Sequence, residues 1–430
     1  MRQSFAGIEN FLEQRKKRIL LILLLVTLAT GIAYSIYLGD ELRFLPDEQD
    51  YLTLAQNLVG HQKYAFPIEQ SPRWTEPTPE GLVPTAYRAP GYPLFLAIFV
   101  WAGAGVVHLK MVNFFALALS LFLVYQILEK WTAETNSVAP ILGALFVLAY
   151  PVLIFTAGTL YPQIFGGLLF LGVLYLLSFK EITYWRMILA GVLWGYLCLT
   201  IPLFLYTLPV FLLWMISRED ISLKYMGIFI CLSLLVIGIW TYRNYRVFDA
   251  FVLISTNFGV NLALGNSEFT VVNAATDVNF LEKWPIMHHL TEVEQNTHLK
   301  GAAWNFIVNN KAQALKLYTS KFLNFFNFRN ELATETQTPS WQNIVMLITY
   351  GPLLLLACLR LFIRNSIPLS KFEALLVILY LGGAFVSAAF FTRIRLRLPF
   401  DYALILLDAL FIGKIIELWK KTPAKVKDEV

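Results

Sequence analysis

The chain contains few charged residues and few cysteines for its length. Of its 430 residues, 15% are Asp, Glu, Lys or Arg and 57% are hydrophobic, whereas soluble domains carry roughly 25% charged residues. This balance excludes an ordinary soluble domain and predicts an integral membrane protein. The three cysteines lie within apolar segments, at spacings that fit neither a metal site nor a disulfide framework. They are Cys198, Cys231 and Cys358.

Long runs without charge mark the candidate membrane spans. Residues 19–38 carry no charge and are long enough to cross about 30 Å of hydrocarbon as a helix. Four basic residues at 15–18 precede this run, so the positive-inside rule places the N-terminus in the cytoplasm and the next segment outside. A cleaved signal peptide is the alternative for such a start. Because no small-residue cleavage site follows the run, we predict a retained first helix.

Further apolar segments predict an all-α polytopic membrane protein with about ten transmembrane helices. The loops assigned to the inside carry Lys and Arg, which agrees with both termini in the cytoplasm and a multi-pass position in the cytoplasmic (inner) membrane. The net charge of +5 is then a topology signal, and no nucleic-acid partner is expected. The segments after the first are 108–128, 139–157, 161–179, 187–200, 202–217, 225–240, 341–362, 372–391 and 398–414.

Two polar regions are too long to be simple connectors, and both lie outside on this topology. The first belongs to a transmembrane core at 1–240, which includes a first outer loop at 39–107. The second is a separate outer region at 241–340. The remaining residues, 341–430, supply C-terminal transmembrane helices and a cytoplasmic tail.

Both outer regions contain segments of helical character. Apolar residues recur at helical spacing from Tyr51 to Val59, which predicts a helix lying on the membrane surface. The apolar run 92–104 is too short to span and predicts a second interfacial helix. The region after residue 241 opens with a Gly- and Asn-rich loop and becomes helical over residues 294–327.

The sequence PDEQDY at residues 46–51 places three carboxylates just beyond the first predicted span, where lipid headgroups meet water. A carboxylate at that depth can act as general base for a sugar, lipid or protein hydroxyl that lies within hydrogen-bond reach. Asp47 and Glu48 are the candidates. The alternative is that Asp47 caps the surface helix, with Asp50 at the third helical position. The two interpretations can coexist.

Arg88 stands immediately before a Pro-Gly turn that opens the second interfacial helix. On this topology its guanidinium lies at the membrane surface on the same side as Asp47. There it can pair with a lipid phosphate through two parallel hydrogen bonds. The alternative is an interfacial anchor that reaches toward lipid headgroups, which is common for a single arginine.

Four motifs, taken in order, resemble those of the bacterial GT-C glycosyltransferases, in particular the protein mannosyltransferase-like and aminoarabinose-transferase-like branch. The resemblance covers most of the chain, and the order and sidedness of the motifs make it more specific than any one motif. The motifs are PDEQDY at 46–51, YRAPGYPLFLA at 87–97, WTYRNYRVFDAFVLISTNFGVNLALGN at 240–266 and RIRLRLP at 393–399.

This resemblance implies a GT-C fold and a glycosyltransferase activity. The implied donor is a sugar on a polyprenyl phosphate, transferred with inversion at the outer face of the membrane to a glycan, lipid or protein acceptor. It also implies that Asp47 is the catalytic base and that Arg88, Arg243, Arg395 and Arg397 lie on the donor-phosphate side. Fixed cations there would stabilise the anionic leaving group. Headgroup binding remains the alternative for each arginine.

The sequence departs from the family pattern at positions that leave the donor sugar open. Where many relatives carry an acidic residue near the start of the fourth span, this chain has Tyr161, Pro162 and Gln163. Relatives of the aminoarabinose type often have Arg before the tyrosine of the first motif, whereas this chain has Asp50.

Several other polar residues are candidate substrate contacts. Asn257 and Asn261 flank glycines in a loop, where turn chemistry explains them equally well. For Lys321 the alternative is a contact with lipid headgroups. The histidines of the outer region have no carboxylate at ligand spacing, so we expect no metal site. We expect no cofactor, and we do not favour a divalent cation at the acidic motif. The candidate contacts are Tyr51, Tyr87, Asn257, Asn261 and Lys321.

Asp408 is the exception in an otherwise charge-free set of predicted spans. A carboxylate in a membrane span is a functional candidate by default. It keeps open a transporter or flippase, or an inactive protein that binds lipid-linked sugars. Transporters concentrate polar groups near the membrane midplane, often in two related halves. Here the ionisable residues crowd the outer surface and no repeat is visible, so the sequence favours the enzyme.

Overall fold

The part of the chain that the computed structural model describes is mainly helical. Over the described ranges it forms seventeen α-helices, four short 3-10 turns and one two-stranded antiparallel sheet. The predicted all-α polytopic fold is therefore confirmed. The described ranges are 2–43, 46–70, 78–133, 137–272, 278–329 and 340–421.

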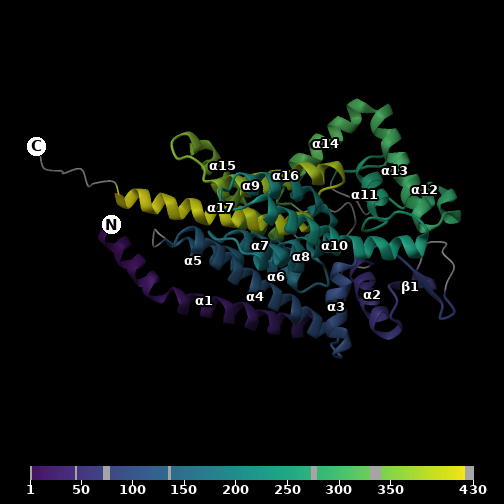
Figure 1. The fold of residues 1–430 in the computed structure, drawn as a ribbon, viewed down its shortest axis with the longest axis horizontal. Coiled ribbons are helices and arrows are strands. Elements are labelled where there is room, and N and C mark those ends of the chain that lie inside the picture. Colours follow the sequence, from purple (N-terminus) through teal and green to yellow (C-terminus); the bar gives the residue numbers. More distant parts are fainter. Residues whose placement is uncertain are drawn as a thin grey trace, which may run out of the picture.

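A bundle of helices runs along the long axis of the molecule (Figure 1). Each apolar segment found in the sequence lies in one of these helices or in an adjoining pair. The start of α1 and the end of α17 lie at the same end of the bundle. The helices and the turn joined to them are α1 (Arg2–Leu38), α4 (Val106–Trp131), α5 (Ala139–Leu148), α6 (Pro151–Ala157), α7 (Gln163–Leu177), α8 (Tyr184–Thr200), η2 (Pro202–Tyr206), α9 (Thr207–Ile216), α10 (Leu223–Phe248), α15 (Ser340–Phe362), α16 (Lys371–Ala389) and α17 (Ile394–Lys421).

Two of the predicted spans are broken, and proline explains both breaks. The segment 139–157 forms two helices, α5 and α6, bent by 55°. Pro151 opens α6 because a proline cannot donate to the preceding turn and its ring clashes with that turn. The segment 202–217 starts as a 3-10 turn with Pro202 at its first position.

Five helices are each long and apolar enough to cross a membrane, and the bent pair α5–α6 makes a sixth when it is counted as one span. The protein is therefore a multi-pass membrane protein. Helices α7, α8, α9 and α17 also hold predicted spans but do not meet that length and composition test, so the total stays a prediction. The five are Arg15–Leu38, Val106–Trp131, Leu223–Phe248, Trp341–Asn365 and Lys371–Ala389.

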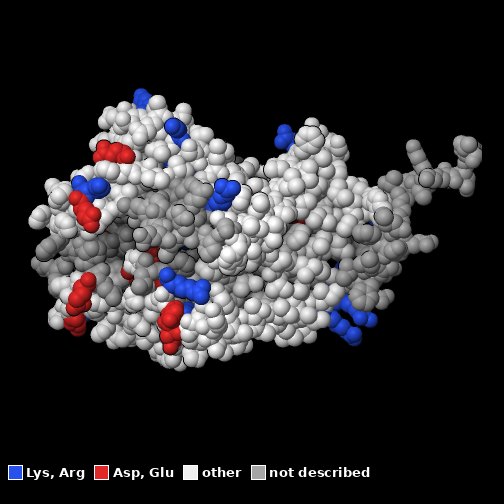
Figure 2. All heavy atoms as spheres, turned by 180° about the vertical axis from the view of Figure 1, so that it is seen from behind, with Lys and Arg blue, Asp and Glu red and all other residues white. Residues whose placement is uncertain are grey.

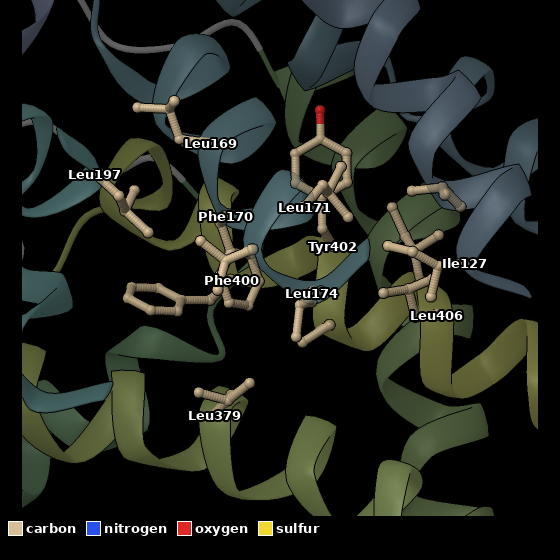
Figure 3. Packing of buried hydrophobic residues seen from close by; sticks show 14 of the residues in the cluster. Ile127, Leu169, Phe170, Leu171, Leu174, Leu197, Leu379, Phe400, Tyr402 and Leu406 are labelled. Atoms are coloured by element: carbon tan, nitrogen blue, oxygen red, sulfur yellow. The ribbon is translucent and has the colours of Figure 1, made fainter. Parts of the chain in front are cut away.

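Leucine and aromatic side chains from several helices fill the centre of the bundle. Figure 3 shows Phe170 and Leu174 of α7 close to Phe400 of α17, with Leu379 of α16 beside them. All four are buried. Within a membrane such packing holds helices together through van der Waals contact, because the surrounding lipid tails are as apolar as the core.

The end of the bundle opposite the two chain termini carries the outer helices and the small sheet (Figure 1). The predicted surface helix is present as α2, the second interfacial helix as α3, and the later helical stretch as α13 and α14. Helix α11 lies in the stretch that we expected to be a loop. These elements are α2 (Asp47–His61), β1 (Ala65–Pro67), η1 (Ile68–Gln70), β2 (Leu82–Pro84), α3 (Gly91–Trp101), α11 (Phe258–Gly265), α12 (Phe280–Lys283), η3 (Pro285–His289), α13 (Glu292–Asn309) and α14 (Lys311–Phe325), with η4 (Ile363–Asn365) at the other end.

Charged side chains gather toward the ends of the molecule. On the face shown in Figure 2, most red and blue side chains lie over the end that carries the outer helices, and the middle is largely white. Large apolar side chains of the bundle, such as Ile239 on α10 and Leu355 on α15, are exposed. This distribution suits a helical bundle surrounded by lipid, because charged groups are costly in hydrocarbon.

Candidate functional site

A cavity of about 910 Å³ lies where the bundle meets the outer helices. The starts of α2, α7 and α17, the segment before α3, turn η2, helix α11 and the end of α16 all contribute to its lining. Much of the wall is apolar, and a few polar groups converge on one part of it, which is the usual form of a ligand site. Asp47, Arg88, Arg395 and Tyr161 form this group, and Gln163 and Arg393 also line the cavity.

The carboxylate of Asp47 joins two arginines that come from distant parts of the chain. Its Oδ1 accepts from Nη2 of Arg88 at 2.6 Å, and its Oδ2 accepts from Nη2 of Arg395 at 2.8 Å. Burial raises the pKa of Asp47, but the two guanidinium groups outweigh burial and lower that pKa to about 2. Asp47 is therefore an ionised carboxylate held between two cations.

Arg88 makes a second ion pair and lies beside two aromatic rings. Its Nε and Nη2 donate to Oδ2 of Asp50 at 2.9 and 2.7 Å. The guanidinium carbon lies 5.4 Å from the centre of the Tyr51 ring and 5.0 Å from that of Tyr87. Aromatic faces attract a cation at these distances. Arg88 is thus fixed on several sides before any ligand binds.

Helix α2 begins at Asp47 itself. Pro46 occupies the N-cap position and no side-chain hydrogen bond caps the helix, so the expectation that Asp47 caps it is wrong. Asp47 and Asp50 are three residues apart and therefore lie on one face of the helix. Both use that face to bind Arg88.

The two late arginines have different surroundings. Arg395 lines the cavity, and its guanidinium carbon lies 4.6 Å from the centre of the Tyr161 ring. Arg397 is fully buried, pairs with Asp401 at 3.0 Å and donates to two backbone carbonyls near the end of α14. Because α17 begins at Ile394, residues two apart project about 200° from each other. The structure thus brings Arg395 to Asp47 and holds Arg397 among the packed helices.

Glu48 is fully buried and does not line the cavity. Its Oε1 accepts the backbone N–H of Arg43 at 3.0 Å, and its Oε2 accepts the backbone N–H of Leu160 at 2.8 Å. These bonds join the start of α2 to the link between α6 and α7. This geometry is that of an anchor, and the catalytic role of Glu48 stays a prediction.

Arg243 of α10 also lies outside the cavity lining. Its guanidinium donates to the carbonyl of Thr85 at 2.7 Å and to that of Tyr64 at 2.9 Å. The hydroxyl of Tyr64 in turn donates to the carbonyl of Arg88 at 2.9 Å. Arg243 therefore contacts the backbone that carries Arg88, and a contact with phosphate stays a prediction.

Glu292, the first residue of α13, was not found from the sequence. It is 3% exposed, and its carboxylate accepts from the hydroxyl of Thr85 at 2.7 Å and from the backbone N–H of Ala86 at 2.9 Å. The hydroxyl of Thr256 also donates to it. Glu292 thus ties the segment before Arg88 to the outer region.

The other candidate contacts divide between the cavity and the packed interior. The two tyrosines and two asparagines of this set line the cavity, whereas Lys321 does not. Burial lowers the pKa of the lysine to about 8, and its Nζ donates to two backbone carbonyls, at 2.7 and 2.9 Å. It therefore joins the ends of α11 and α16. The residues are Tyr51, Tyr87, Asn257, Asn261 and Lys321.

Comparisons with known proteins bear on the fold. No protein-family model and no curated protein matches the chain. The structure is similar to the oligosaccharyltransferase AglB from Archaeoglobus fulgidus in complex with an inhibitory peptide and a dolichol-phosphate, with a TM-score of 0.56 and 14% identity over 96% of this chain and 53% of that one. A second structure from that organism, tethered to an acceptor peptide, gives 0.55 and 12% over 94% and 51%.

ArnT from Cupriavidus metallidurans, bound to undecaprenyl phosphate, gives a TM-score of 0.45 and 12% identity over 92% of this chain and 77% of that one, which is too low to support an argument. The chain spans about half the length of the oligosaccharyltransferases it matches. At these identities the likeness shows the fold alone. The chain has the GT-C fold that its motifs led us to expect.

Replacing Glu48 by Gln tests the anchor. The amide keeps the shape of the side chain but gives up one of the two acceptor atoms that bind backbone N–H groups. We expect the free energy of unfolding to fall by about 1–3 kcal/mol, measured by thermal unfolding of the purified protein in detergent. Glu41→Gln, at a nearby exposed residue, is the control. Equal unfolding midpoints for the two variants would contradict the anchor.

Proposed function

We propose that the protein is an inverting glycosyltransferase. It moves a sugar from a polyprenyl phosphate to a hydroxyl of a glycan, lipid or protein at the outer face of the cytoplasmic membrane. One observation carries the proposal: a single carboxylate, Asp47, is held between Arg88 and Arg395 in the wall of a cavity at one end of the membrane bundle. That arrangement supplies both a base and cations for an anionic leaving group.

The proposed reaction is a single displacement. The acceptor oxygen attacks the anomeric carbon of the donor sugar, and the bond from that carbon to the phosphate oxygen breaks. The acceptor proton goes to Asp47, and the electron pair leaves with the polyprenyl phosphate. Arg88 and Arg395 stabilise the charge that grows on this phosphate. The bond forms on the side opposite the one that breaks, so the configuration inverts.

Arg88 and Arg395 bind Asp47 in the free protein and bind the phosphate when the donor is present. In the structure both oxygens of Asp47 are bound to guanidinium groups, which makes Asp47 a weak base. The Nε of Arg395 is buried and has no hydrogen-bond partner among the described residues, so Asp47 does not use all the donors of this guanidinium. A donor phosphate that binds both arginines loosens their hold on Asp47. The base then gains strength only when the donor is in place.

Arg88 and Arg395 supply the counter-charge for the phosphate in the proposed reaction, which therefore needs no divalent cation. Both oxygens of Asp47 already bind Arg88 and Arg395, and Asp50 binds Arg88. A metal ion at the acidic motif would have to displace these guanidinium groups. The similar AglB structure contains a dolichol-phosphate, which is chemically the kind of lipid phosphate that the proposal requires.

Glu292 and Arg243 act as positioning residues in this proposal. They bind the backbone and hydroxyl groups of residues 85 and 86 from two sides. Arg88 comes two residues later and is itself held through its carbonyl by Tyr64. A small displacement of a group that binds the leaving phosphate is costly, because catalysis requires the reacting atoms to be held in one geometry.

Replacing Asp47 by Asn should abolish most of the transfer. The amide keeps the size of the side chain but cannot accept the acceptor proton, and loss of a general base costs about 10²–10⁴-fold in rate. Purified protein with polyprenyl-phosphate sugars and candidate acceptors provides the measurement. Transfer by Asp47→Asn at the wild-type rate would rule out the assigned base.

Asp408 provides the test of the transport alternative. It is buried, lies outside the cavity lining, and neither of its oxygens has a hydrogen-bond partner in the described part of the chain. A membrane carboxylate of this kind occurs in transporters. Uptake of lipid-linked sugar into proteoliposomes that depends on Asp408, and not on Asp47, would favour transport over transfer.

The pH dependence of transfer should differ between the free and the donor-bound protein. In the free protein the pKa of Asp47 is about 2, so the carboxylate stays ionised throughout an ordinary assay range. A bound phosphate shares Arg88 and Arg395 and raises this pKa toward its usual value of roughly 4. Protonation removes the base, so kcat should fall at a higher pH than kcat/KM does as the solution is acidified. If kcat and kcat/KM fell at the same pH, Asp47 would remain bound to Arg88 and Arg395 in the donor complex.

Replacing Thr256 tests the positioning of Arg88. Thr256→Val removes the hydroxyl that donates to Glu292, whereas Thr256→Ser keeps it. We expect the valine variant to raise the donor KM, with kcat/KM falling about ten-fold or more, and the serine variant to behave as the wild type. Glu294→Gln is the control, because that exposed side chain binds Thr291 at the start of its own helix. Equal losses in both Thr256 variants would show that the hydroxyl does not matter.

A further inference from the structure

Two buried neutral side chains in the cavity wall have polar atoms without a partner among the residues that the structure describes. Gln163 is 6% exposed and its Oε1 accepts no hydrogen bond; Ser387 is 2% exposed and its Oγ is likewise unbonded. Both residues line the cavity. Buried polar atoms are nearly always bonded to protein, water or ligand. A ligand bound in the cavity is therefore the candidate partner for both atoms.

Gln163 lines the same cavity as the proposed reacting centre. It is the first residue of α7 and comes two positions after Tyr161. The Tyr161 ring lies beneath the guanidinium of Arg395, at 4.6 Å, and Arg395 binds Asp47. The sugar must lie between the phosphate that the arginines hold and the base that takes the acceptor proton. The amide of Gln163 belongs to the wall of the cavity that would hold this sugar.

We propose that Gln163 binds a hydroxyl group of the donor sugar, and that the subsite it forms with Ser387 takes a neutral sugar. An amide and a hydroxyl each offer a donor and an acceptor, which matches the hydroxyl groups of a neutral sugar. A buried ammonium group on an amino sugar requires a negative partner. Asp47, the carboxylate that lines the cavity, is already bound to Arg88 and Arg395, and Asp50 next to it is bound to Arg88.

Other parts of the cavity wall suit the apolar faces of a sugar ring. Tyr161, Tyr206, Phe390 and Phe391 line the same cavity. Aromatic side chains supply broad apolar surface, and a few polar groups then fix the orientation of the ligand. Recognition by one amide and one hydroxyl within aromatic walls selects for shape and hydroxyl position rather than for charge.

This inference rests on the proposed function, and its test separates the two. Purified full-length protein is given two donors that share one polyprenyl phosphate, one with a neutral hexose and one with an amino sugar. Gln163→Ala should lower kcat/KM for the neutral donor by about ten-fold, as expected for a lost hydrogen bond to substrate. It should leave the inhibition constant of sugar-free polyprenyl monophosphate unchanged, and Ser387→Ala should act in the same way.

Replacing Gln163 by Glu supplies the negative charge that the subsite lacks. This variant should shift the preference toward the amino-sugar donor relative to the wild type. An equal loss of affinity for the sugar-free phosphate, or a rise in the acceptor KM alone, would overturn the assignment of Gln163 to the donor sugar. A wild-type preference for the amino sugar would overturn the neutral subsite.

Equilibrium binding keeps the subsite testable without any transfer. The wild type should bind the neutral donor with a lower Kd than the sugar-free polyprenyl phosphate. Gln163→Ala should bring these two Kd values closer together. If the wild type transfers from neither donor yet shows this difference, the proposed reaction fails while the sugar subsite stands. If no difference exists in the wild type, the subsite fails.

Discussion

The sharing of one carboxylate between two arginines is the interaction on which the site depends. Asp47 starts α2, Arg88 precedes α3 and Arg395 lies in the first turn of α17, so this contact joins the start of α17 to segments that lie about 300 or more residues earlier in the sequence. Charges taken out of water must be paired, and removal of one partner leaves the others uncompensated. The same need for a counter-charge makes the arginines receptive to a phosphate. The charges of Asp47, Arg88 and Arg395 therefore both stabilise the fold at the cavity and carry out the proposed chemistry.

Other charged residues near the cavity hold the backbone rather than face the ligand. Glu48 binds one backbone N–H group before α2 and one in the link between α6 and α7. Glu292 and Arg243 hold the segment that carries Arg88, and Arg397 binds carbonyls at the end of α14. In a membrane protein, backbone groups outside helices need partners of their own. Charged side chains supply them, and the loops that carry the site become fixed as a result.

Local sequence patterns predicted the bundle and part of the site. Apolar length and basic flanks indicated the bundle helices, helical spacing indicated α2, and the acidic motif with Arg88 pointed to residues that the structure brings together. Arg397 was grouped with Arg395 because both lie in one motif, and only the start of α17 at Ile394 shows that they project apart. Glu292 bonds residues 206 and 207 positions away, which no local pattern can reveal. Gln163 appeared in the sequence as a departure from the family, and its importance became visible only with its unbonded atom in the cavity.

Binding of a sugar-free polyprenyl monophosphate to the wild type and to Asp47→Asn tests the central claim most directly. If Asp47 and the phosphate share Arg88 and Arg395, removal of the carboxylate's charge frees both guanidinium groups. Asp47→Asn should then bind the phosphate lipid more tightly than the wild type, even though its transfer is lost. Equal or weaker binding by Asp47→Asn would contradict the account, because the arginines would then not be the place where the phosphate binds.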